Sequence, residues 1–176
     1  MKENNQTSLS LDVKFKVKDV LRYNVSVACK NKVNVMMMAL GIGVLAYFFY
    51  KLLTSGERVD IFFARHIVLL VVPVIIFIMI PWKVWQITLT QMQQPAFAYG
   101  VKYIFSPESI VLDIGEASEE MKWDIFVKVL ETKHDFRFYV NAISAQIIPK
   151  HNMDEGQLQI LRKIIQEAAS DRSQLK

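Results

Sequence analysis

The stretch His66-Ile-Val-Leu-Leu-Val-Val-Pro-Val-Ile-Ile-Phe-Ile-Met-Ile-Pro-Trp-Lys-Val-Trp85 decides the fold class of this chain. From Ile67 to Ile80 it contains no charged and no polar side chain. As a helix, residues 67–85 would be about as long as the hydrocarbon core of a bilayer is thick, roughly 30 Å. Pro73 and Pro81 would break a helix in water, but prolines are tolerated in membrane helices. The stretch therefore predicts a transmembrane helix.

A second apolar run, Val33–Leu53, lies upstream of this stretch. Its 21 residues would extend about 32 Å as a helix. A soluble domain of this size rarely holds two helices that are apolar on every face. A cleaved signal peptide does not fit, because the run is too long and no small-residue cleavage site follows it. We therefore predict a hairpin of transmembrane helices at 33–53 and 67–85, joined by a short external loop at 54–66.

Positive charge is concentrated in front of the first span. Residues 1–53 carry eight Lys/Arg against three Asp/Glu, residues 54–96 carry three against two, and residues 97–176 carry ten against twelve. Because cytoplasmic flanks of spans are enriched in Lys and Arg, both chain ends are predicted to be cytoplasmic in a multi-pass protein of the cell membrane. The candidate contacts to anionic lipid are Lys14, Lys16, Lys18, Arg22, Lys30 and Lys32. A nucleic-acid partner is not expected, since the most globular part is net negative.

Residues 1–32 are predicted to form a basic cytosolic segment that contains a strand and a short helix. Apolar and polar side chains alternate from Leu9 to Val17, and this period of two is typical of a strand with one buried face. Asp19 is a plausible N-cap for the helix that follows.

Residues 97–176 have the pattern of a small α+β domain. Several short strand-like stretches, the first at 97–105, precede one amphipathic helix. Asn152 is the predicted N-cap of this helix, with Glu155 at its third position. Its apolar stripe consists of Leu158, Leu161, Ile164, Ile165 and Ala168. We expect this stripe to cover the open end of a curled sheet.

Three short motifs in this region carry a family resemblance: Phe105-Ser-Pro-Glu-Ser-Ile110, Trp123-Asp-Ile-Phe-Val-Lys-Val-Leu-Glu131 and Ile147-Ile-Pro-Lys150. With them, the chain resembles the YcxB-like family of bacterial membrane proteins. The resemblance implies that residues 97–176 form a pleckstrin-homology-like curled antiparallel sheet capped by a C-terminal helix. It would also allow the strand at Leu9–Val17 to join the later strands, with the spans inserted into the domain. The residues themselves leave that pairing open.

No pattern in the sequence predicts an enzyme, a cofactor or a metal. The three histidines show no metal-ligand spacing, and Cys29, the only cysteine, has no histidine beside it in the sequence. Gly41-Ile-Gly-Val-Leu-Ala46 fits a dinucleotide-binding motif, but it lies inside a predicted span and lacks the required flanking strands. Small residues in a span more often allow close helix packing, and Ala39 with Gly43 has the appropriate spacing.

We therefore predict a non-enzymatic, membrane-anchored interaction or scaffold protein, whose cytosolic domain binds a protein partner near the inner leaflet. Trp123 is a candidate partner contact, with a role as a core aromatic as the alternative. Lys150 is a second candidate, which could meet a phosphate or simply lie in water. The alternative function, which the resemblance permits, is immunity or resistance against membrane-active peptides. The sequence is compatible with a homo-oligomer.

Overall fold

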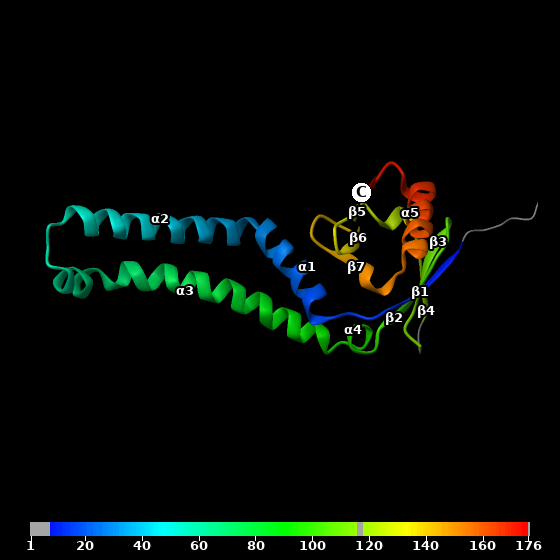
Figure 1. The fold of residues 1–176 in the computed structure, drawn as a ribbon, viewed down its shortest axis with the longest axis horizontal. Helices are drawn as coiled ribbons and strands as arrows, with labels where there is room; N and C mark the ends of the chain where they lie inside the picture. Colours follow the sequence, from blue (N-terminus) through cyan, green and yellow to red (C-terminus); the bar gives the residue numbers. More distant parts are fainter. Residues whose placement is uncertain (1–7, 116–117, 176) are drawn as a thin grey trace, which may run out of the picture. The chain divides into compact units, whose positions relative to one another are not determined.

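The computed structural model describes residues 8–115 and 118–175, so the first seven residues of the predicted N-terminal segment lie outside the described residues. Figure 1 shows the order of helices and strands along the chain. The chain divides into two compact units. We call residues 21–89 the helical unit, and residues 1–20 together with 90–176 the sheet unit.

The helical unit contains most of α1 (Val17–Lys30) and two long apolar helices, α2 (Lys32–Thr54) and α3 (Val59–Met92). Both long helices have the length and apolar composition needed to cross a membrane. Both predicted spans are thus helical, with wider bounds than predicted. The connection between them shortens to residues 55–58, because α3 begins at Val59 and includes the charged residues of its first turns.

Aromatic rings and one glycine pack α2 against α3. The rings of Phe48 and Phe62 are both buried and meet edge to face, with 5.5 Å between their centroids. Gly41 is buried against α3, where a Cβ atom would lie 3.3 Å from Cζ of Phe77. Around Gly43, by contrast, a Cβ atom would meet nothing within 4 Å in the described part of the chain. The helix contact therefore uses Gly41 and not the small-residue pair predicted from spacing, because Gly41 is on the face that meets α3.

The sheet unit is built from two four-stranded sheets. In the first, β1 (Leu9–Val13), β2 (Val101–Phe105), β3 (Ser109–Asp113) and β4 (Ser118–Lys122) lie in this order, and all neighbours are antiparallel. The second has the order β7-β6-β5-β8, formed by β5 (Lys128–Glu131), β6 (Asp135–Tyr139), β7 (Ala145–Pro149) and β8 (Ser173–Gln174). Its neighbours are antiparallel except for the short β8, which runs parallel to β5.

The N-terminal strand β1 is part of the sheet unit, although α1, α2 and α3 separate it from β2 in the sequence (Figure 1). Leu11 lies opposite Tyr103, and Val13 lies opposite Val101. The alternating pattern puts Leu9, Leu11 and Val13 in the core, with Ser10 and Asp12 exposed. The pairing that the family resemblance allowed is therefore present. The compact unit is larger than the predicted domain at 97–176, since it includes this strand.

The first predicted strand after the helices starts later than expected. Residues Pro95–Tyr99 form the short helix α4, and β2 begins at Val101. Gly100 between them has a φ of +91°, a conformation that side chains with a Cβ rarely adopt. A Cβ atom here would also lie 2.8 Å from the backbone oxygen of Val13. Glycine thus permits the turn that brings β2 alongside the end of β1.

The C-terminal helix α5 (Glu155–Ala169) covers the core that the two sheets share. The predicted stripe is confirmed: Leu161, Ile164 and Ile165 are fully buried. The cap lies two residues later than predicted, because Asp154 accepts from the backbone of Gln157 and the Gln157 side chain bonds back, which forms a capping box. Asn152 instead belongs to the short 3-10 helix at Lys150–Asn152, and its side chain bonds both the N–H and the carbonyl of Lys14.

Candidate functional site

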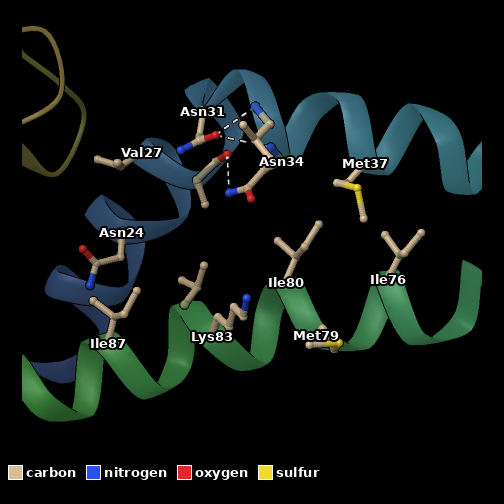
Figure 2. Close-up of a pocket in the computed structure, with 13 residues that line it drawn as sticks. Asn24, Val27, Asn31, Asn34, Met37, Ile76, Met79, Ile80, Lys83 and Ile87 are labelled. Atoms are coloured by element: carbon tan, nitrogen blue, oxygen red, sulfur yellow. Dashed lines mark hydrogen bonds between the residues drawn. The ribbon is translucent and has the colours of Figure 1, made fainter.

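A cavity of about 530 Å³ lies among α1, α2 and α3, entirely within the helical unit (Figure 2). Thirteen residues line it. Four of them are polar: Asn24, Asn31, Asn34 and Lys83. The others are apolar: Val27, Ala28, Val33, Met37, Ile76, Met79, Ile80, Val84 and Ile87. We call this cavity the hairpin pocket.

Two asparagines fix the joint between α1 and α2 at one end of the pocket. The Asn31 side chain accepts hydrogen bonds from the backbone N–H groups of Val33 at 2.9 Å and Asn34 at 3.3 Å, so it is the N-cap of α2. The Asn34 side chain donates to the carbonyl of Ala28 at 3.2 Å. Only one residue separates the two helices, and these bonds hold the resulting bend (Figure 2).

A third asparagine joins α1 to α3. Asn24 Nδ2 donates to Oγ1 of Thr88 at 3.0 Å. The Thr88 hydroxyl in turn donates to the carbonyl of Val84 at 2.8 Å, one turn earlier in α3. Thr88 is fully buried, so this bond satisfies a hydroxyl that would otherwise be costly to bury. At the polar end of the pocket, side-chain hydrogen bonds thus link α1 to both α2 and α3.

Lys83 supplies the only charge in the lining of the pocket. Figure 2 shows its ammonium group directed from α3 into the space toward α1 and α2. No hydrogen bond or ion pair to Lys83 is found among residues 8–115 and 118–175. The sequence gives the reason, since residues 61–107 contain no Asp or Glu. The pocket therefore presents a cation that has no internal carboxylate.

The other end of the pocket is apolar. Met37 from α2 faces Ile76 and Ile80 from α3 across the cavity (Figure 2), and Met79 also contributes to the lining. A second pocket of about 440 Å³ in the same unit, next to Cys29 and Trp85, is lined by apolar side chains and that cysteine. The hairpin pocket differs from this second pocket because its lining changes along its length, from amide and ammonium groups at one end to hydrocarbon side chains at the other.

Trp123, the first predicted contact residue, lies in the core of the sheet unit. Only 4% of it is exposed, and its ring packs against Phe126 and Phe138. Its Nε1–H group donates to the carbonyl of Ser106 at 2.8 Å. The side chain therefore has no surface to offer a partner, and its role is that of the core aromatic, which was the alternative interpretation.

Lys150, the second predicted contact, belongs to an ion cluster around the buried carboxylate of Glu131, and 17% of its side chain is exposed. Its Nζ atom lies 2.5 Å from Oε1 of Glu131 and 5.1 Å from the centre of the Phe136 ring. Arg162 from α5 approaches the same carboxylate, with Nη2 at 2.6 Å and Nε at 3.2 Å from both oxygens. These hydrogen bonds to Glu131 raise the pKa of Arg162. The cluster ties β5 to α5 and has a structural role.

The predicted lipid-contact residues divide between the two units. Lys14, Lys16 and Lys18 are exposed in the sheet unit. In the helical unit, Lys30 and Lys32 are exposed and Arg22 is half-buried. None of the six lines the hairpin pocket. Lys83 was not among the predicted lipid contacts, although the absence of Asp and Glu from residues 61–107 is a signal in the sequence that could have singled it out.

Two histidine side chains make structural contacts, and the described residues contain no candidate metal cluster. His66 stacks on Phe62, and its Nδ1 atom lies 3.1 Å from the Phe62 carbonyl. His151 Nε2 lies 2.8 Å from Oδ2 of the buried Asp19, which joins the start of α1 to the rest of the sheet unit.

These features define a chain in which two long apolar helices are inserted into a two-sheet domain with a C-terminal helix. Residues 105–165 match the model of a family described as YcxB-like protein, which confirms the predicted resemblance over that part of the chain. No curated protein and no solved structure is significantly similar to the chain.

Proposed function

We propose that the protein is a non-enzymatic, membrane-anchored interaction protein, with a pleckstrin-homology-like domain that binds a protein partner at the cytoplasmic face. The observation that carries the anchor is the exposed apolar surface of α2 and α3. Side chains such as Leu40, Phe49, Val68 and Ile78 are each more than half exposed. Exposure of this much hydrocarbon to water costs roughly 25 cal/mol per Å², whereas a bilayer solvates it.

The distribution of acidic and basic residues along the sequence supports the orientation. At the loop between the long helices, Arg65 pairs with Glu57 at 2.6 Å and Arg58 pairs with Asp60 at 3.0 Å. At the opposite end of the helical unit, the basic residues Arg22, Lys30, Lys32 and Lys83 have no acidic residue between 21 and 56 or between 61 and 107. Excess positive charge favours the cytoplasmic side, so the two chain ends are cytoplasmic and the loop is external.

We place the partner surface on a different part of the sheet unit from the two predicted contact residues. Four exposed apolar side chains, Ile125, Val127, Val140 and Ile143, come from the segments that border the ends of β5 and β6. The backbone N–H of Val127 bonds the carbonyl of Tyr139 at 2.8 Å, which brings the two segments together. We call these residues the β5–β6 end patch. Exposed apolar side chains on neighbouring segments of a folded domain are typical of a protein-interaction surface.

Single cysteines test the topology. In a Cys29→Ser background, we expect Ser55→Cys in the external loop to react with a membrane-impermeant maleimide in intact cells or spheroplasts. Asp171→Cys, at a site exposed in the sheet unit, should react only after permeabilisation. Release of the unmodified chain by alkaline carbonate, or labelling of Asp171→Cys in intact cells, would show that the proposed anchor or its orientation is wrong.

Site-specific photo-crosslinking in cells tests the partner surface. A photoreactive residue at Val127 or Ile143 should give one discrete adduct with the same protein. The exposed residue Glu167 on α5 is the matched control site and should give no such adduct. Val140→Asp should remove the adduct at Ile143, because a charge in the patch opposes apolar burial. Equal labelling at all three sites would contradict a specific surface.

A further inference from the structure

We propose that the hairpin pocket binds one anionic phospholipid, with the phosphate at Lys83 and an acyl chain along the apolar end. This inference rests on the proposed membrane insertion of α2 and α3. It assigns a ligand to a place where none of the predicted lipid-contact residues lies.

The charge of the pocket favours an anion. A lysine within an apolar helix is costly unless it is paired or reaches the membrane interface. Lys83 is directed into the pocket (Figure 2), and residues 61–107 provide no carboxylate to neutralise it. A lipid phosphate would supply the missing negative charge, and a charge-assisted hydrogen bond between ammonium and phosphate is among the stronger polar contacts.

The polar groups around Lys83 suit the rest of a headgroup. Asn24, Asn31 and Asn34 line the same end of the pocket as Lys83. The bonds of their side chains to Thr88, to the α2 backbone and to Ala28 hold them in place, so the site is formed before a ligand arrives. A preformed site avoids the entropic cost of ordering side chains on binding.

The opposite end of the pocket matches hydrocarbon. Met37, Met79 and Ile80 give it an apolar lining, and flexible methionines adapt to irregular ligands. The order from ammonium and amides to aliphatic side chains is the order from phosphate to acyl chain in a phospholipid. Free phosphate would use only the first part of this lining. A zwitterionic lipid such as phosphatidylcholine also carries a phosphate, but its choline cation would offset the negative charge beside Lys83.

Native mass spectrometry of the full-length protein, titrated in neutral detergent micelles with phosphatidylglycerol or phosphatidylcholine, tests the proposal. We expect one phosphatidylglycerol to bind at least about fivefold more tightly than phosphatidylcholine, as one ion pair at an interface would give. Lys83→Gln should abolish this preference and Lys83→Arg should retain it. Lys32→Gln removes a charge from the same end of the helical unit but outside the pocket, and should change the preference by less than twofold.

Two further measurements test whether the bound molecule is a phospholipid. Met37→Trp should displace the lipid by filling the apolar end without changing any charge, and millimolar inorganic phosphate should not compete. Equal binding of both lipids, an unchanged preference in Lys83→Gln, or a second copy of the chain in place of the lipid would each overturn the inference. If the cysteine topology holds while the lipid preference is absent, the pocket assignment fails and the membrane anchor stands. If the cysteine labelling contradicts the proposed topology, both the membrane anchor and the pocket assignment fail.

Discussion

Residues 97–176 are expected not to fold when they are produced without the N-terminal strand. Removal of β1 takes Leu9, Leu11 and Val13 out of the core, where their exposed fractions are 6%, 2% and 1%. Burial of one such side chain contributes about 1.5–3 kcal/mol, so the three together contribute about 5–9 kcal/mol. A whole domain is stable by only about 5–15 kcal/mol, and the truncation also exposes the bonding edge of β2.

Circular dichroism and amide NMR spectra measure this result. The matched control is a chain in which a flexible Gly-Ser linker replaces residues 21–89, so that residues 8–20 and 90–176 are both present. The linked chain should give dispersed amide resonances, whereas residues 97–176 alone should give a collapsed spectrum or aggregate. A dispersed spectrum from residues 97–176 alone would show that β1 is dispensable.

The same contact can be tested in the full-length protein with glycine substitutions. Gly100→Ala puts a Cβ atom 2.8 Å from the Val13 oxygen at a φ of +91°. Gly115 has a similar φ of +87°, but a Cβ atom there meets nothing within 4 Å among the described residues. Positive φ alone costs about 1–3 kcal/mol, so Gly115→Ala measures that strain. Gly100→Ala should lower the free energy of unfolding by more than Gly115→Ala does, because the added Cβ atom also forces β1 and β2 apart.

Loss of the Glu131 carboxylate is expected to destabilise the sheet unit by about 3 kcal/mol, near the lower end of the range for a broken buried ion pair. Glu131 is fully buried, and Glu131→Gln leaves the cations of Lys150 and Arg162 close together without their shared anion. The side chains of these two residues are still 17% and 23% exposed. Water can therefore solvate part of the released charge, which places the effect at the lower end.

Urea unfolding of the full-length protein in micelles measures this effect. Trp82→Phe and Trp85→Phe leave Trp123 as the only tryptophan, and its burial makes its emission a reporter of the sheet unit. The exposed Glu120→Gln is the control for loss of one acidic charge and should change the free energy of unfolding by less than about 0.5 kcal/mol. An equally small change for Glu131→Gln would mean that the cluster contributes little to stability.

The sequence by itself determined the features that depend on local pattern. Length and apolar composition determined the two long helices, because a helix with no polar face is recognisable without knowing its neighbours. The 3–4 spacing of Leu161, Ile164 and Ile165 likewise predicted which face of α5 is buried. Alternation predicted β1 as a strand with one buried face, but not its partner.

Features that depend on contacts between residues far apart in the sequence were decided only by the tertiary structure. The pairing of β1 with β2 forms across the inserted helices, and the register that buries Leu11 exists only when both strands are present. The same holds for Lys150, whose partner Glu131 lies 19 residues earlier, in β5, and for Lys83, which becomes a pocket residue only where three helices meet. Local pattern records which side chains avoid water, whereas the position of a charge relative to a distant carboxylate depends on how the whole chain folds.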